Sequence, residues 1–505
     1  MRRGGFSPLV SLLRAGFSLP ARRRFWLGLA AFGLLPHPAQ AAAPVPVKIT
    51  PPVQARVGAK PRILILTDIG NEPDDSESLV RLLLYANEFD IAAIIATTST
   101  WQRDRVRPDL IDQRLDAYAQ VWPNLTHHAD GYPSPDILRQ RRIAGAPLYG
   151  MKGVGKGHDS KASAAIIAAV DAGSAERPLW VLAWSGVTDL AQALWHIRAT
   201  RSPAEQARFL SKLRVYSISD QDDAGPWARL NFPSLFWIAS IHGWGQYNMA
   251  AWTGISGDRR SAEQWPDRDK VQDPWLEANI RRGPLGALYP LPAFIMEGDT
   301  PSLLYMIPNG LSDPERPDWG SWGGRYMAAT PRQKPGQGLY ADTKDVFTRD
   351  GALYAGNQAT IYRWRGSFQN DFAARMAWTL TPDRTKANHA PQAIVNGEAG
   401  RAPLRITAKA GETIHLDAAR SHDPDGDAIT AHWWQYRDVG GIPPQAPIAI
   451  AAPDAMETAI TLPKVTAPRD LHMILELSDH GAPAMVVYRR IIISVLPVAA
   501  AKPAP

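Results

Sequence analysis

The sequence predicts an α/β domain built on a mostly parallel sheet, followed by a small all-β sandwich. Between residues 60 and about 385, buried apolar runs alternate with amphipathic helical patterns. From about residue 386, short alternating runs are separated by Pro, Gly and Asp. An aspartate-rich turn after the first strand marks the edge where sheets of this class bind ligands.

The first 41 residues resemble an export signal. Three arginines, Arg22–Arg24, precede an apolar stretch over 25–35 that is too short to span a bilayer, and Ala41 ends a small-residue cleavage site. The paired arginines fit twin-arginine export, with an ordinary secretory signal as the alternative. We expect a periplasmic or secreted protein after cleavage near Ala41, with a linker over 42–59 and no membrane span.

The composition excludes several kinds of site. The formal net charge of +6 comes from arginines within residues 1–41, so the rest of the chain is neutral overall and gives no sign of nucleic-acid binding. The sequence has no cysteine, which excludes disulfides, thiol catalysis and thiolate metal sites. Its 18 tryptophans would suit sugar-stacking surfaces, although buried tryptophan is commoner.

Four buried strands and four helices are predicted in the first domain, and their alternation favours a parallel sheet. A long stretch, 220–345, is rich in Gly, Pro and Trp, and we expect it to form loops with few clear elements. The predicted strands are 63–66, 91–97, 179–184 and 214–219, and the predicted helices are 76–86, 109–121, 161–171 and 187–198.

The character of the chain changes near residue 385. The runs "TIHLDAA", "ITAHWWQYR", "TAITLP", "MILELSD" and "YRRIIISV" alternate with turn residues and predict an all-β sandwich of ordinary domain size. We therefore expect a first domain over 60–385, the sandwich over 386–497 and a disordered tail over 498–505.

Three aspartates stand where the first strand gives way to the first helix. In "ILILTDIGNEPDDSESLVRLL" the apolar run 63–66 leads into Asp68, Asp74 and Asp75. Turn formation and helix capping explain some aspartates at such a place. The alternative is a metal site, because calcium takes several hard carboxylate oxygens and a loop at a strand end can supply them.

This stretch resembles the N-terminal aspartate cluster of nucleoside hydrolases, in which a strand ends in Asp, Gly and a pair of aspartates around one calcium. "WVLAWSGVTDLAQAL" resembles their middle segment, where a main-chain carbonyl joins the calcium, and "MEGDTPSLLY" resembles their late segment with a fourth aspartate. The resemblance implies Ca²⁺ held by Asp68, Asp74, Asp75, Val187, Thr188 and Asp299.

The resemblance is closer to a narrower family of exported bacterial proteins described as cellulose-binding. These have a nucleoside-hydrolase-like domain followed by an Ig-like one. "TTSTWQRDRVRPDLI", "SISDQDDAGPWARLNFP", "IPNGLSDPERPDWGSWGGRY" and "ANHAPQAIVNG" all resemble that family, and the similarity covers nearly all of 60–497. It implies a carbohydrate or nucleoside-like small molecule as ligand, with cellulose or another polysaccharide as a candidate.

Several positions depart from nucleoside hydrolases. Leu66 stands where the enzymes have a further aspartate, Gly298 where a histidine precedes the late aspartate, and Tyr149 where a second pocket histidine is expected. The asparagine that holds ribose is replaced by 99–101 (Ser-Thr-Trp). The resemblance thus implies that the calcium ligands are retained, whereas the residues that recognise a nucleoside are replaced. Purine and pyrimidine nucleosides are therefore not expected as substrates.

If the site is catalytic, the resemblance implies cleavage of a glycosyl bond. Asp68 would accept the proton of the attacking water. Leaving-group protonation needs another residue, and we do not rank the candidates. For each of them a solvated or capping role is the alternative: Glu297, Asp222, Asp223 and His158.

Substrate contacts are expected from several segments. Asn231 is the best single match to the segment that contacts the sugar in the hydrolases, with a well-bonded surface loop as the alternative. "DWGSWGGRY" places aromatic residues between glycines, which suits either a flat ligand or a structural lid. The expected substrate-binding residues are Trp101, Asp222, Asp223, Asn231, Glu297 and Trp322.

A second acidic motif lies in the β domain. "HDPDGDAIT" places Asp423, Asp425 and Asp427 at alternate positions. It is not an EF-hand loop, because the twelfth position is Trp434 where that loop needs Glu. A turn and a weak calcium site both fit the motif.

Two functions of different classes follow. One is a calcium-dependent hydrolase of glycosyl bonds outside the cytoplasm, which the retained aspartates and export favour. The other is a carbohydrate-binding protein that keeps the calcium pocket without turnover, which the lost histidines, the tryptophans and the sandwich favour. A structural protein of the cell envelope is a third, blander alternative.

Overall fold

The computed structural model describes residues 60–242, 245–263, 265–440 and 445–498. The predicted signal peptide and linker lie outside these residues, as does the predicted tail after its first residue. Within the described ranges no helix has the length and apolarity needed to cross a membrane.

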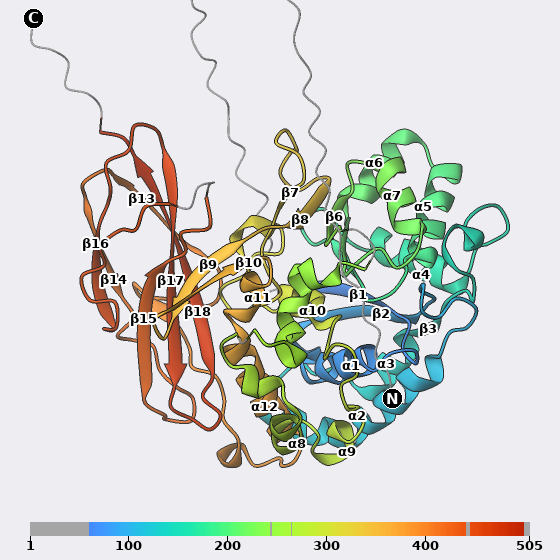
Figure 1. Ribbon diagram of the computed structural model, residues 1–505, viewed down its shortest axis with the longest axis horizontal. Helices are drawn as coiled ribbons and strands as arrows, with labels where there is room; N and C mark the ends of the chain where they lie inside the picture. The colour runs from blue at the N-terminus through green and yellow to red at the C-terminus, as the bar shows by residue number, and fades with distance from the viewer. Residues whose placement is uncertain (1–59, 243–244, 264, 441–444, 499–505) are drawn as a thin grey trace, which may run out of the picture. The chain divides into compact units, whose positions relative to one another are not determined.

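An eight-stranded sheet forms the centre of the α/β part, residues 60–386 (Figure 1). Its strand order is β3-β2-β1-β4-β5-β6-β8-β7, and only β7 runs antiparallel to its neighbour. The mostly parallel sheet and its four predicted strands are confirmed. The strands are β1 (Arg62–Thr67), β2 (Asp90–Ala96), β3 (Arg142–Ala144), β4 (Leu179–Ala183), β5 (Leu213–Ser217), β6 (Phe236–Ala239), β7 (Tyr326–Ala328) and β8 (Leu339–Asp342).

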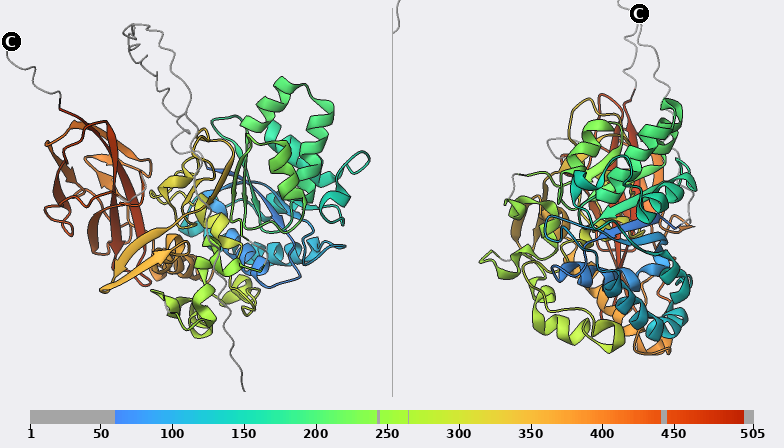
Figure 2. Two further views of the ribbon diagram at one scale, coloured as in Figure 1. Left: turned by 45° about the horizontal axis from the view of Figure 1, so that its top comes forward. Right: turned by 90° about the vertical axis from the view of Figure 1, so that its right-hand side faces the viewer.

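Helices cover both faces of this sheet (Figures 1 and 2). Alternate residues of β1 enter two separate cores, with Ile63 and Ile65 facing α1, α2, α10 and α12, and Leu64 and Leu66 facing α4 to α7. All four predicted helices are confirmed. The helices are α1 (Asp74–Leu84), α2 (Pro108–His128), α3 (Pro135–Arg141), α4 (Lys161–Asp171), α5 (Thr188–Thr200), α6 (Pro203–Ser211), α7 (Ala224–Asn231), α8 (Asp273–Asn279), α9 (Gly283–Gly286), α10 (Thr300–Met306), α11 (Ala359–Tyr362) and α12 (Arg365–Trp378).

The prediction of few elements between 220 and 345 is wrong in part. That stretch contains α7 to α10 and strands β6 to β8. Its helices have at most eight residues, and β6 has four fully buried residues, so neither kind of element is long enough to show a period. The described residues between β6 and α8 include the 3₁₀ helices η3 (Tyr247–Met249), η4 (Ala251–Ile255), η5 (Gly257–Arg260) and η6 (Arg268–Val271).

The C-terminal β part, residues 387–498, contains strands and no helix among its described residues (Figure 2). Its larger sheet has the order β13-β18-β17-β15, and β14 pairs with β16. The predicted all-β character is confirmed, and the Ig-like sandwich stays a prediction. The strands are β11 (Ile394–Val395), β12 (Glu398–Ala399), β13 (Leu404–Lys409), β14 (Thr413–Asp417), β15 (Ile429–Gln435), β16 (Glu457–Thr461), β17 (Arg469–Asp479) and β18 (Val486–Leu496).

Buried polar contacts join the α/β part to the C-terminal β part. They centre on Asp345, which begins the hairpin of β9 (Asp345–Arg349) and β10 (Ala352–Gly356). Asp345 is fully buried, forms a salt bridge with Arg363 at 2.8 Å and accepts the hydroxyl of Tyr436 at 2.6 Å. Nearby, the guanidinium of Arg490 donates to the carbonyl of Trp319 at 2.9 Å. These contacts bind the two parts through groups that are hidden from solvent.

Candidate metal centre and adjoining pocket

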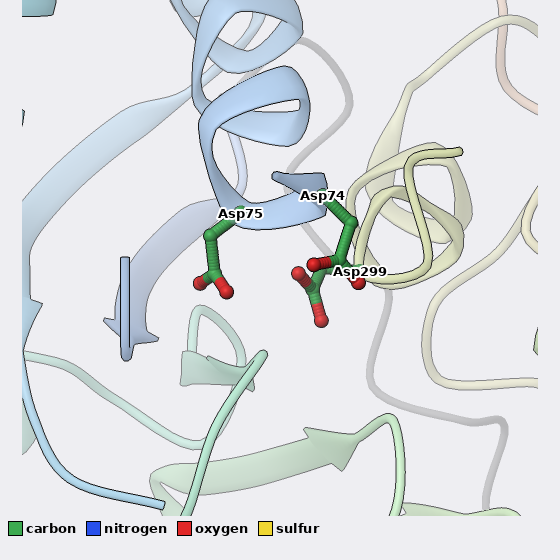
Figure 3. Close-up of side chains that lie close together, drawn as sticks. All are labelled: Asp74, Asp75 and Asp299. Carbon is green, nitrogen blue, oxygen red and sulfur yellow. The ribbon is translucent and has the colours of Figure 1, made fainter. Parts of the chain in front are cut away.

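Three carboxylates meet beside the first turn of α1. Asp74 and Asp75 begin that helix and Asp299 directly precedes α10, and each offers an oxygen that lies within 4.8 Å of the other two (Figure 3). All three residues are buried, with at most 8% of their surface exposed. No side chain caps α1 at its N-cap residue, Pro73. Helix capping therefore does not explain the aspartates.

The hydrogen bonds of these carboxylates are incomplete. Asp75 accepts the hydroxyl of Thr67. Oδ1 of Asp74 and Oδ2 of Asp299 are buried and have no hydrogen-bond partner among the described residues. Buried polar atoms are nearly always paired in native proteins, so oxygens of this kind indicate a group that binds there. Hard, ionised oxygens are the ligands that calcium prefers.

Asp68 lies at the end of β1, next to this cluster. Its carboxylate accepts the hydroxyl of Ser99, and its main-chain carbonyl accepts the amide of Gln102 at 3.1 Å. Its oxygens are not within the group of three, and it does not line the adjoining pocket. The proximity of its charge nevertheless raises the pKa of Asp75. Asp68 thus borders the cluster from the strand side.

Burial and mutual repulsion raise the pKa of every carboxyl in this centre. Burial, opposed by the hydrogen bond from Ser99, raises the pKa of Asp68 to about 6. Burial and then the charges of Glu72 and Asp68 raise the pKa of Asp74 to about 7. The pKa values of Asp75 and Asp299 are raised well above the usual range, first by burial. A divalent cation would offset this concentration of negative charge.

A pH dependence follows from these shifts. In metal-free protein the native state holds more protons than the unfolded state between pH 4 and 7, since the pKa of Asp68 is raised from 3.8 to about 6 and that of Asp74 to about 7. Stability therefore falls as pH rises through this window. Calcium needs ionised carboxylates, so its stabilising effect should grow over the same range.

Melting curves at pH 5 to 8, in calcium and in chelator, test this expectation. We expect the melting temperature in chelator to fall with pH and the calcium-induced increase to be larger at pH 8 than at pH 5. Asp74→Asn should flatten the curve in chelator, because it removes one of the titrating groups. An equal calcium effect at both ends of the range would contradict the charge-compensation account.

A pocket of about 620 Å³ opens beside the three carboxylates, a volume typical of small-ligand sites. Glu72, Asp74 and Asp299 line its metal side. Its other walls contain six aromatic residues among polar and small ones, and they come from the loops after β2, β5 and β6, from the segment before α10 and from α11. The aromatic lining residues are Trp101, Tyr247, Trp252, Trp265, Phe294 and Tyr362.

Two polar atoms in the pocket wall resemble the unpaired carboxylate oxygens. Oε1 of Gln221 and Nε1 of Trp252 are buried without a hydrogen-bond partner among the described residues. One is an acceptor and the other a donor, which suits a ligand with hydroxyl groups. Two aromatic residues of the lining are well exposed, Trp101 at 44% and Phe294 at 77%. The pocket thus combines hydroxyl-pairing atoms with exposed aromatic surface.

Of the predicted substrate residues, the structure brings only Trp101 to the pocket. Asp222 accepts the main-chain N–H groups of Val187, Ala224 and Gly225 and so shapes the loops after β4 and β5. Asp223 accepts from the N–H of Met151 at 2.8 Å. The remaining three are engaged elsewhere, with Asn231 bonded to Arg198, Glu297 to Arg81 and Trp322 to Tyr488.

The predicted main-chain ligands lie at the start of α5. The carbonyl of Val187 accepts the N–H of Ala191 at 2.8 Å, and Thr188 pairs through its hydroxyl with Asp222 and Gly150. A carbonyl oxygen has a second lone pair, so the carbonyl of Val187 can bind a metal ion while it keeps this hydrogen bond. His158, a candidate acid, does not line the pocket.

Several pocket residues had no signal in the sequence. Glu72 lies in the turn between β1 and α1 among more conspicuous aspartates, and Gln221 directly precedes the predicted Asp222 and Asp223. Phe294 has a positive φ of 49° and is exposed, which no local pattern announces. Tyr247 and Trp252 lie in 3₁₀ helices within the stretch that was expected to be loop.

The second acidic motif forms a turn. Asp423, Asp425 and Asp427 also bring oxygens within 4.8 Å of one another, but they are partly or fully exposed. Asp423 accepts the N–H groups of Asp425 and Asp427 at 2.8 and 3.2 Å, and Asp425 pairs with His389 at 2.9 Å. These bonds show that the motif forms a turn, while Oδ2 of Asp423 is buried without a hydrogen-bond partner among the described residues, so the weak calcium site stays a prediction beside it.

Comparisons with known proteins agree with the two-part organisation. Residues 62–326 match the family model "Cellulose-binding Sde182, nucleoside hydrolase-like domain", and residues 413–495 match "Cellulose-binding protein Sde0182, C-terminal domain". No curated protein matches the chain.

The chain is also similar to solved structures. A nucleoside hydrolase-related hypothetical protein from Saccharophagus degradans, associated with carbohydrate metabolism, is 35% identical, with a TM-score of 0.74 over 86% of this chain and 100% of that one. The PKD domain of the KIAA 1837 protein is 12% identical, with a TM-score of 0.15 over 20% of this chain and 87% of that domain, too low to indicate a shared fold. The chain therefore belongs to the cellulose-binding Sde182 family, whose first domain has the nucleoside-hydrolase-like fold.

Proposed function

We propose that the pocket binds a carbohydrate beside a calcium ion and that the protein hydrolyses a glycosyl bond, N- or O-linked, outside the cytoplasm. The observation that carries this proposal is the meeting of Asp74, Asp75 and Asp299, with unpaired buried oxygens, at the wall of an aromatic pocket. Ligand sites of α/β sheets lie at the carboxyl ends of the strands, where these residues stand.

The residues present fit calcium. Asp74, Asp75 and Asp299 would hold it, with Asp68 and the main chain at Val187–Thr188 as further candidates. When bound, calcium supplies Lewis acidity toward water and sugar hydroxyls.

The chain's own carboxyls divide the proton transfers. Asp68 would take the proton of the attacking water, because its carboxylate borders the three aspartates that would hold calcium. Glu72 lines the pocket and is partly exposed, so it can reach the leaving group. Two earlier candidates, Glu297 and Asp222, are buried and fully engaged with protein groups.

Carbohydrate recognition is assigned to the aromatic wall and to Gln221. The flat, apolar face of a sugar ring packs on exposed aromatic side chains, and Trp101 and Phe294 offer such surface at the pocket. Gln221 and Trp252 add an acceptor and a donor for hydroxyl groups. The family description as cellulose-binding makes a glucan the first ligand to test.

Replacing Trp101 should weaken carbohydrate binding. Trp101→Ala removes aromatic contact worth about 1.5–3 kcal/mol, so we expect the Kd for soluble cello-oligosaccharides to rise about tenfold or more. Isothermal titration calorimetry in calcium measures this change. Trp227→Ala is the matched control, because Trp227 is partly buried and does not line the pocket. Equal affinities for both variants would contradict the assignment of the aromatic wall.

A second candidate function is carbohydrate binding without turnover. The family description and the absence of the two pocket histidines favour it, since Tyr149 and Gly298 stand in their places. In that case calcium and the aromatic wall bind sugar, and the protein shows affinity but releases no product.

We also infer an export signal over 1–41, a first domain over 60–385 and an Ig-like sandwich over 386–497.

A further inference from the structure

The segment that leads to Asp299 has an unusual backbone. Phe294 and Glu297 both adopt positive φ angles, 49° and 53°, although neither is glycine. Such conformations are uncommon for side chains of this size and persist only where surrounding contacts determine them. The segment is therefore held in place by something outside itself.

The side chain of Glu297 provides the first part of that hold. It is fully buried, and its Oε2 accepts from Nε of Arg81 at 2.7 Å while its Oε1 accepts the hydroxyl of Tyr289 at 2.9 Å. The main-chain N–H of Glu297 donates to Oε2 of Glu77 at 2.6 Å. Glu297 is thus tied to α1 through both its side chain and its backbone.

Arg81 is itself fixed from the other side. Its Nη1 donates to the carbonyl of Phe368 at 3.2 Å, and its Nη2 donates to the side chain of Gln369. Its guanidinium lies 3.7 Å from the ring centroid of Phe372, and none of its surface is exposed. The position of Arg81 is therefore set by α12 as well as by α1.

The spacing of polar residues along α1 explains how this hold reaches the metal centre. Glu77 and Ser78 lie three and four residues after Asp74, and Arg81 lies four and three residues after them, so the four residues share one face of the helix. Ser78 accepts the hydroxyl of Thr300 at 2.9 Å. Asp299 thus lies between two residues, 297 and 300, that are each bonded to the helix carrying Asp74 and Asp75.

We propose that Arg81 and Glu297 are positioning residues of the calcium centre, because they hold Asp299 against Asp74 and Asp75. The inference rests on the proposed calcium site. Glu297 does not line the pocket, so it acts through Asp299 and not on the ligand. Burying an ion pair is a costly way to gain stability, whereas its short, directional hydrogen bonds fix geometry.

Calcium titration of Glu297→Gln tests this role. The substitution keeps the size of the side chain and all metal ligands but removes the charge that pairs with Arg81. Outer contacts that orient metal ligands are worth about 10–100-fold in affinity. We therefore expect the calcium Kd, measured by calorimetry on folded protein, to rise by about that factor. Arg81→Lys should also weaken calcium binding, because lysine keeps the positive charge but lacks the planar guanidinium that donates several hydrogen bonds at once.

The control is a buried ion pair away from the centre. Arg325 and Asp345 pair at 2.6 Å with side-chain exposures of 5% and 0%, and neither lines the pocket. Arg325→Gln should lower the melting temperature and leave the calcium Kd within about twofold of wild type.

The outcomes are distinguishable. A wild-type calcium Kd in Glu297→Gln, with a melting decrease like that of the control, would overturn the positioning role and leave the calcium site standing. Wild-type protein that binds no calcium would overturn the proposed centre and this inference together. If Glu297→Gln does not fold, the calcium Kd and the melting temperature of Arg81→Lys are compared with those of Arg325→Gln instead.

Discussion

Asp68→Asn is expected to lower the turnover rate by about two or more powers of ten, while the protein still binds carbohydrate and calcium. An asparagine keeps an oxygen toward the cluster and the bond from Ser99 but no longer accepts a proton. Release of reducing sugar from a cello-oligosaccharide measures turnover, and calorimetry on the same samples measures binding. A change confined to turnover is the mark of a lost base.

Glu72→Gln is the companion variant, because Glu72 lines the pocket and Asp68 does not. Substantial hydrolysis by calcium-loaded Asp68→Asn would place the base elsewhere, with Glu72 as the next carboxyl to test. If neither the wild type nor the variants release product, and their affinity for carbohydrate is unchanged, the protein binds carbohydrate without turnover.

Asp299→Ala is expected to remove the calcium-dependent part of the stability. Calcium at about 100 times its Kd should raise the free energy of unfolding of the wild type by about 2.7 kcal/mol, because the ion binds the native state. The variant loses a ligand whose Oδ2 has no hydrogen-bond partner in the described part of the chain, so little stability should be lost in chelator. Melting curves in calcium and in chelator give both quantities.

Asp423→Asn is the control for other acidic clusters, since Asp423 belongs to the second group of close carboxylates. It should leave the calcium effect unchanged. An equal melting decrease for Asp299→Ala in calcium and in chelator would indicate lost packing instead of a lost ligand.

The sheet and the aspartate cluster were predictable because their signals are local. Four apolar residues, 63–66, then acids, then helical spacing reveal a strand end and a helix start within one short stretch. Asp299 was placed by resemblance, since no local pattern connects it with residues more than 200 positions earlier.

Most of the pocket was not predictable. Apart from Glu72, Asp74 and Trp101, its walls come from short segments between residues 218 and 362, which carry no periodicity and are brought together by the sheet. The acids Asp222 and Asp223 attracted attention by their type, yet they bind main-chain N–H groups of neighbouring loops. Residue type alone does not distinguish a carboxylate that shapes a loop from one that faces a ligand.

The buried contacts around Asp345 bear on how the protein can be divided. Asp345 and Arg363 both belong to the α/β part, whereas Tyr436 reaches this carboxylate from the β part, so the hydroxyl of Tyr436 would lose its partner if the chain were split. A binding module on a free tether can be moved to another protein, but this β part shares buried polar contacts with the α/β part. A fusion that carried the β part alone would expose groups that lose these partners, so the natural unit for engineering includes both parts, residues 60–498.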